Sequence, residues 1–156
     1  MKVKSFMNKW YNNNFYDGGG STTKEYSNFQ QNYRSVLKEI GNDIGFELHS
    51  FSKNHYEFSA VMQSIISKQF YYISISDVRY WKNEWADHIL YRTMEHEKDW
   101  TGGSNQYSSL NDLSENLINL DKQIIRNLEL KNNSQVSYSP QTEKTIYEDF
   151  ESEYDY

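Results

Sequence analysis

The chain has 156 residues, no cysteine and a net charge of −6, and aromatic residues make up 17% of it. The lack of cysteine excludes a disulfide scaffold and a thiolate metal site, and no apolar run is long enough for a membrane span. The negative charge argues against a general affinity for the nucleic-acid backbone, which requires clustered Lys and Arg, and the length suits one domain.

The first 22 residues show little periodicity and contain three consecutive glycines at 18–20. Such a run is typical of a joint rather than of an element interior, so we predict a flexible N-terminal arm over residues 1–22. The segment has basic residues but no continuous apolar stretch, unlike a secretory signal, and we expect a cytoplasmic protein. Four aromatic side chains of the arm could dock onto the body of the protein or onto a partner, and both alternatives stay open: Phe6, Trp10, Phe15 and Tyr16.

A helix is predicted next, with Thr22 or Thr23 as its N-cap and Gly41 as its stop. Apolar side chains recur three and four residues apart, on one face of a helix that ends at about Ile40: Tyr26, Phe29, Tyr33, Val36, Leu37 and Ile40.

Between residues 46 and 75 the period changes towards two, which predicts antiparallel strands with one wet face. One strand contains Phe46, Leu48 and Phe51, a second runs through residues 56–62, and a third covers Phe70–Ile75 with serines on one face. Residues 88–93 are rich in β-forming side chains and predict a fourth strand.

A second helix is expected from Leu110 to about Leu128, with Ser108 or Ser109 as its cap. Its apolar stripe consists of Leu113, Leu117, Leu120, Ile124 and Leu128. Residues 23–130 are thus predicted to form one two-layer α+β domain, with an N-terminal helix, a three- to four-stranded antiparallel sheet and a C-terminal helix.

Residues 131–156 form a polar segment that we expect to be a flexible, acidic and aromatic-rich tail. Between residues 143 and 155 there are six acids and one base, so most of the negative charge lies here. Carboxylates beside aromatic rings can steer a protein towards a basic groove and then contact it, although such a tail can also serve solubility alone. The tail residues that we assign to partner binding are Glu148, Asp149, Phe150, Glu151, Glu153, Tyr154 and Asp155.

Residues 77–110 hold the remaining candidates for chemistry. His88 and His96 lie near several acids, but their spacing matches no known metal site, which needs three or four converging ligands. His96 oriented by Asp99 could act as a general base, but no motif for hydrolysis or nucleotide binding accompanies it. We therefore expect a non-enzymatic protein with no metal and no cofactor.

The loop Thr101-Gly102-Gly103-Ser104-Asn105 precedes the second helix and is a candidate anion-binding loop. Arg79 and Arg92 could provide the countercharge, and together these groups could form a nucleic-acid or nucleotide-binding module. The alternative is a tight turn whose polar side chains bond their own backbone while the arginines pair with nearby acids.

Three tryptophans, Trp81, Trp85 and Trp100, could serve as anchors at a protein interface. We expect at least one of them in the core and at least one on the surface. With Arg79 and Arg92 they complete the candidate partner-binding residues of the body.

The amino-acid sequence of this part of the chain resembles that of small proteins of phages and mobile elements of low-GC Gram-positive bacteria. The resemblance lies in residues 74–79, Trp81, 89–93 and 99–107, and it extends over roughly residues 45–128. Proteins of this kind include anti-CRISPR proteins, notably inhibitors of Cas9 in type II-A systems.

The resemblance implies a non-enzymatic inhibitor that binds Cas9 with its guide RNA in the host bacterial cytoplasm and blocks DNA binding or cleavage. It carries no catalytic residues. A basic nuclease that holds guide and target is a suitable partner for an acidic, aromatic-rich protein. Whether the chain forms a homodimer is left open by the sequence.

Overall fold

The computed structural model describes residues 1–53, 57–76 and 78–135, and for residues 80–83 and 134–135 it describes the backbone alone. Five strands form one antiparallel sheet in the order β1-β2-β3-β4-β5. The predicted α+β class is confirmed, with one strand more than expected. In chain order the elements are α1 (Val3–Trp10), the 3₁₀ turn η1 (Gly20–Thr22), α2 (Lys24–Ile44), β1 (Phe46–Lys53), β2 (Phe58–Ser64), β3 (Phe70–Ile75), α3 (Val78–Trp81), the 3₁₀ helix η2 (Lys82–Asp87), β4 (Ile89–Met94), β5 (Gln106–Ser108) and α4 (Leu113–Gln135).

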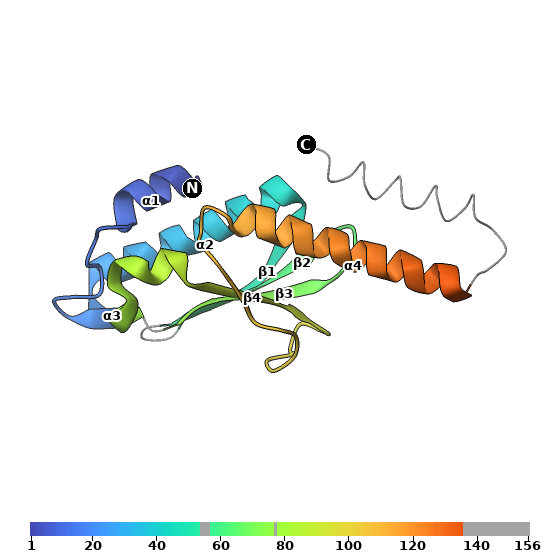
Figure 1. The fold of residues 1–156 in the computed structure, drawn as a ribbon. Helices are drawn as coiled ribbons and strands as arrows, with labels where there is room; N and C mark the ends of the chain where they lie inside the picture. The colour runs from blue at the N-terminus through green and yellow to red at the C-terminus, as the bar shows by residue number, and fades with distance from the viewer. Residues whose placement is uncertain (54–56, 77, 136–156) are drawn as a thin grey trace.

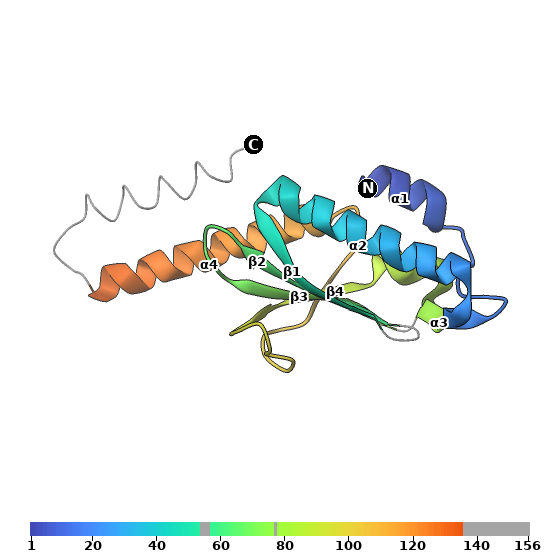
Figure 2. The ribbon, with the colours of Figure 1, turned by 180° about the vertical axis from the view of Figure 1, so that it is seen from behind.

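The long helices lie on one side of the sheet. Figure 1 and Figure 2 show α2 and α4 on the same side, with α1 next to α2 and farther from the strands. The opposite face carries no helix within the described residues, and the connection between β4 and β5 projects on that side. The sheet therefore has a core face and an open face.

The N-terminal segment is not a flexible arm, which corrects the prediction for residues 1–22. Residues 3–10 form α1, and Phe6, Trp10 and Phe15 are 3% exposed or less. The ring of Phe15 stacks on Phe29 of α2 with a centroid distance of 3.7 Å. Of the two alternatives for these aromatic side chains, the structure shows docking onto the body. Their rings cover part of the apolar stripe of α2, which an amphipathic helix must bury against another element.

The helix α2 starts where the sequence predicts and ends one turn later. The side chain of Thr23 accepts a hydrogen bond of 3.1 Å from the backbone N–H of Tyr26. Gly41 lies inside the helix, and Gly45, with a φ of 77°, is the residue that ends it. A Cβ at Gly41 would lie 2.7 Å from the carbonyl oxygen of Phe46, so this glycine allows the start of β1 to approach α2 closely.

The helix α4 begins after the turn that Ser109 caps, through a 3.1 Å hydrogen bond from the N–H of Asp112 to Oγ of Ser109. It continues seven residues beyond the predicted end at Leu128, to Gln135. The buried row also differs from the predicted stripe, since Leu128 is 48% exposed. A spacing of four residues relates the buried side chains, which are Leu113, Leu117, Asp121, Ile125 and Glu129.

A carboxylate anchors α4 to the sheet. Asp121 is fully buried and accepts hydrogen bonds from the hydroxyl groups of Ser64 at 2.7 Å and of Ser67 and Tyr71 at 2.6 Å each. Buried charges in proteins require such partners. The three donors come from the end of β2, the β2–β3 turn and β3, so this cluster fixes the position of the helix along the sheet.

Candidate partner-binding surface

Strand register determines which side chains reach the open face. Val61, Tyr72 and Arg92 are paired across β2, β3 and β4, and Leu90 is paired with Tyr107 in the neighbouring row. Side chains alternate between the two faces of a sheet, and the intervening residues belong to the core on the helix side. These two rows therefore form the open face near the β4–β5 connection.

Arg92 is buried on this face rather than exposed, which corrects its assignment as a contact residue. Its side chain is 3% exposed. One guanidinium nitrogen donates to the carbonyl of Asp99 at 2.9 Å and another to that of Thr93 at 3.2 Å. The guanidinium also lies 4.7 Å from the centroid of the Tyr72 ring, a cation–π arrangement. Arg92 thus holds the β4–β5 connection against the sheet.

Trp100 is presented to solvent by this connection. It is 57% exposed, and its ring meets Tyr72 edge to face at a centroid distance of 5.9 Å. Tyr107 on β5 is 63% exposed. We call Tyr72, Trp100 and Tyr107 the aromatic surface. The ring of Trp100 rests on Tyr72, and the ring of Tyr72 rests on Arg92, so Trp100 is held in position before any partner arrives.

The candidate anion-binding loop already surrounds a carboxylate of the chain. Asp99 accepts hydrogen bonds from the backbone N–H groups of Glu95 at 3.0 Å, Gly102 at 2.8 Å and Thr101 at 3.4 Å. The N–H of Glu95 is the main reason why the pKa of Asp99 lies below its usual value, although burial opposes the shift. Gly103, with a φ of 75°, completes the turn, and Ser104 and Asn105 are exposed. The loop is therefore bonded to the chain itself, as in the alternative that the sequence left open, but the acceptor is the carboxylate of Asp99, and Arg92 donates to carbonyl groups.

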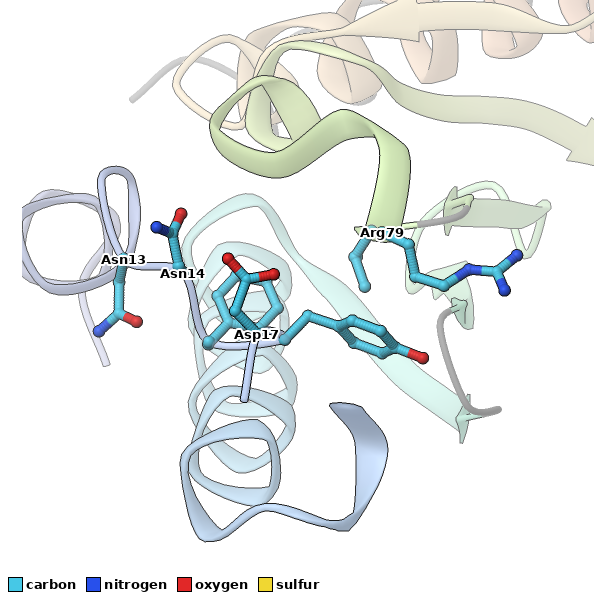
Figure 3. Close-up of a pocket in the computed structure, with 7 residues that line it drawn as sticks. Asn13, Asn14, Asp17 and Arg79 are labelled. Atoms are coloured by element: carbon cyan, nitrogen blue, oxygen red, sulfur yellow. The ribbon is translucent and has the colours of Figure 1, made fainter. Parts of the chain in front are cut away.

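The surroundings of Arg79 differ from those of Arg92. Arg79 is exposed and lies at the start of α3, beside a small cavity that Asn13, Asn14 and Asp17 also line. Figure 3 shows its guanidinium extending away from the two asparagines. The cavity has a volume of about 10 Å³, which is room for about one water molecule. The two arginines therefore do not converge on the Gly-Gly loop.

Trp85 is the centre of the aromatic core, which corrects its assignment to partner binding. It is fully buried, and its ring meets Phe6 and Phe29 edge to face at 5.5 and 5.0 Å. The expected division of tryptophans between core and surface is thus confirmed by Trp85 and Trp100. The side chain of Trp81 lies outside the described part of the chain.

The two histidines considered for chemistry are exposed. The Nδ1 atom of His96 accepts a hydrogen bond of 3.2 Å from the N–H of Lys98. Within residues 1–53, 57–76 and 78–135, no three His, Asp or Glu side chains come together in a way that could hold a metal ion. No helix in these ranges combines the length and apolarity that a membrane crossing requires.

The tail residues assigned to partner binding, Glu148 to Asp155, lie outside the described residues. Two residues of the aromatic surface, Tyr72 and Tyr107, were not among the sequence candidates. The alternation in Phe70–Ile75 could have identified Tyr72, because it shares the wet face with Ser74. Tyr107 had no such signal, since β5 has only three residues.

Comparisons with known protein families, with curated proteins and with solved structures gave no match.

Proposed function

We propose that this chain is a non-enzymatic phage or mobile-element inhibitor of a bacterial defence nuclease, binding Cas9 with its guide RNA in type II-A systems. In this proposal the bound inhibitor blocks DNA binding or cleavage. The observation that carries the binding role is the exposed Trp100, which rests on Tyr72 and through it on Arg92. It lies on a sheet face that no helix of the described residues covers. The choice of Cas9 rests on the sequence resemblance.

The geometry of the aromatic surface favours binding for a physical reason. Tryptophan and tyrosine dominate the binding energy of protein interfaces, and fixing a side chain on binding costs free energy. Trp100 is already restrained by the ring of Tyr72, so less conformational freedom is lost when a partner covers it.

The acidic tail supplies a second argument, from its sequence alone. Five acids among residues 148–155 alternate with the rings of Phe150 and Tyr154. Cas9 binds guide and target in positively charged channels, so a polyanionic segment would accelerate association by long-range attraction. In this proposal the tail steers and the aromatic surface anchors.

The alternative function, a nucleic-acid or nucleotide-binding module, loses its main support. The guanidinium of Arg92 is engaged by carbonyl groups and by Tyr72, and the amides of Thr101 and Gly102 are engaged by Asp99. Arg79 alone would provide a weak contact to phosphate.

The test is a DNA cleavage assay with Cas9 and guide, combined with a measurement of the dissociation constant. We expect excess inhibitor to abolish cleavage and the double change Trp100→Ala with Tyr107→Ala to weaken binding by more than about thirtyfold, which corresponds to about 2 kcal/mol. Leu130→Ala is the matched control, because Leu130 is 65% exposed on α4, away from the open face. Full cleavage at excess inhibitor would exclude Cas9 as the target.

The tail is tested in the full-length chain by replacing its acids with the corresponding amides. We expect a lower association rate and a weaker salt dependence, with little change in the dissociation rate. A scrambled tail of the same composition is the control for charge alone. An unchanged association rate at low salt would remove the tail from the mechanism.

A further inference from the structure

A surface cavity lies where the end of α1 meets the last residue of η2 and the turn before α4. It has a volume of about 420 Å³, which lies within the range of small-molecule sites. Three segments that are far apart in the sequence contribute to its walls, so only the folded chain forms it. Its lining residues are Met7, Asn8, Tyr11, Asn12, Asp87 and Asn111.

The first wall is the end of α1, and packing against α2 fixes its orientation. Trp10 is fully buried, and its Nε1 donates a hydrogen bond of 3.0 Å to Oδ1 of Asn32. Tyr11 keeps a helical backbone directly after α1, so it lies on the same side as Asn8, three residues earlier. Asn8 and Asn12 are exposed, and their amides are therefore accessible to a ligand.

The opposite wall is held together by a backbone hydrogen bond. The N–H of Leu110 donates to the carbonyl oxygen of Ala86 at 2.7 Å, which joins the turn before α4 to the end of η2. The next residues of the two segments, Asn111 and Asp87, are exposed and both line the cavity. The hydroxyl group of Tyr11 donates to Oδ2 of Asp87 at 3.4 Å, so the two walls are in contact.

The charges of the lining argue against an ionic ligand. No lining side chain is cationic, so the cavity provides no countercharge for a phosphate or a carboxylate. Asp87 is the single carboxylate of the lining and is exposed. An exposed ion pair contributes little free energy, so a cation would gain little from this cavity.

A peptide would find none of its usual recognition features here. Peptides bind at sheet edges, in apolar or aromatic grooves, or on clusters of arginines. None of the lining residues belongs to a strand, and none is an arginine. The apolar contribution comes from Met7 and the ring of Tyr11, both of which are half-buried, and it is too small for an apolar groove.

The side-chain amide is the commonest group of the lining. Asn8, Asn12 and Asn111 each offer an NH₂ donor and a carbonyl acceptor, and the hydroxyl group of Tyr11 can do both. Sugar hydroxyl groups likewise donate and accept, and two adjacent hydroxyl groups can bond the donor and the acceptor of one amide. The C–H face of a sugar ring can pack on Tyr11 and Met7.

We propose that this cavity binds a neutral saccharide. The three asparagine amides bond its hydroxyl groups, the carboxylate of Asp87 accepts a hydrogen bond from a further hydroxyl group, and Tyr11 supplies an apolar surface. The site uses none of the residues of the aromatic surface and does not depend on Cas9.

The test is a titration of the isotope-labelled full-length chain, followed through the NMR signals of its asparagine side chains. The probes are the methyl glycosides of glucose, mannose, galactose and N-acetylglucosamine, at concentrations up to tens of millimolar. We expect saturable shifts of the Asn8, Asn12 and Asn111 signals with at least one probe. The matching uronic acid, with a carboxylate in place of the primary alcohol, should bind more weakly, because the cavity contains Asp87 and no cationic side chain.

The double change Asn8→Ala with Asn111→Ala removes hydrogen bonds from both walls and should weaken binding by about tenfold. Asn14→Ala with Asn119→Ala is the matched control, because both are exposed asparagines outside this cavity, and it should leave binding unchanged. Thermal unfolding midpoints that equal that of the unaltered chain show that both variants fold.

The absence of a saturable shift with all four glycosides would overturn the proposal. So would binding that the change of Asn8 and Asn111 leaves intact. Ethanolammonium chloride is the cationic comparison, and tighter binding of this probe than of every glycoside would assign the cavity to a cation and exclude the saccharide.

Discussion

The hydroxyl group of Tyr71 on β3 donates a hydrogen bond of 2.6 Å to Oδ1 of Asp121 on α4, and both side chains are fully buried. Burial raises the pKa of Tyr71, and the charge of Asp121 and the hydrogen bond to it raise this pKa further. Tyr71 therefore stays protonated and donates to the carboxylate. The contact links the last helix to the middle of the sheet.

We expect Asp121→Ala to destabilise the protein by about 3 kcal/mol, because it leaves three buried or half-buried hydroxyl groups without their acceptor. The measurement is the free energy of unfolding from urea denaturation. Asn119→Ala, at an exposed position of the same helix, should change it by less than about 0.5 kcal/mol. A loss equal to that of the control would show that the cluster does not hold α4.

Tyr33→Phe is expected to stabilise the protein. The hydroxyl group of Tyr33 is buried, it has no hydrogen-bond partner within the described ranges, and its burial raises the pKa of the phenol. Removing an unsatisfied buried hydroxyl gains on the order of 1 kcal/mol. Tyr71→Phe is the contrasting variant, because it removes a hydroxyl that is bonded to Asp121, and it should destabilise. Both are measured by thermal and urea unfolding, and a destabilised Tyr33→Phe would contradict the assignment.

The docking of the N-terminal segment predicts a large effect of Trp10→Ala. Trp10 is fully buried, and its Nε1 donates a 3.0 Å hydrogen bond to Asn32 of α2. Truncating a buried tryptophan costs about 3–5 kcal/mol, whereas Lys4→Ala on the exposed side of α1 should be nearly neutral. Equal free energies of unfolding for the two variants would contradict the docking of the N-terminal segment and support the prediction of a flexible arm over residues 1–22.

Asp99 predicts a pH dependence of the loop that carries Trp100. Its pKa in the folded chain is lowered, chiefly by the N–H of Glu95. The bonded carboxylate therefore stabilises the loop fully above the ordinary pKa of about 4, and this contribution is lost as the pH falls through the lower folded value.

Amide exchange of Gly102, whose N–H bonds Oδ1 of Asp99 at 2.8 Å, measures this directly. We expect exchange protection to decrease at acid pH in the unaltered chain and to be low at all pH values in Asp99→Asn. A matched change, Asp112→Asn, affects a carboxylate outside the loop and should preserve the pH profile. Protection of Gly102 that persists in Asp99→Asn would show that the carboxylate does not order the loop.

Local patterns accounted for much of the fold. The alternation in Phe70–Ile75 predicted β3, and the apolar spacing after Thr23 predicted α2 with its cap. The end of α2 was missed because Gly41 looks like a stop in sequence, whereas its role is a close approach to Phe46. A three-residue strand such as β5 is too short to show any period.

The candidate surface was predicted only in part. Trp100 was expected at the surface and lies there, but Trp85 and Arg92 were assigned to the surface and are buried. In the sequence a buried tryptophan and an exposed one look alike, because both lie in short polar contexts. What separates them is that α1 packs on Trp85, whereas Trp100 belongs to the sheet face that no helix of the described residues covers.

The sequence by itself determined the alternation in β2 and β3, the N-terminal caps of α2 and α4 and the concentration of negative charge near the C-terminus, because these depend on neighbouring residues. Only the tertiary structure decided that the N-terminal aromatic side chains complete the core, that Arg92 serves Tyr72 and Asp99, and that Asp121 is buried among hydroxyl groups. Each of these depends on contacts between residues far apart in the chain, whose free energy comes from burial and partner geometry rather than from local pattern.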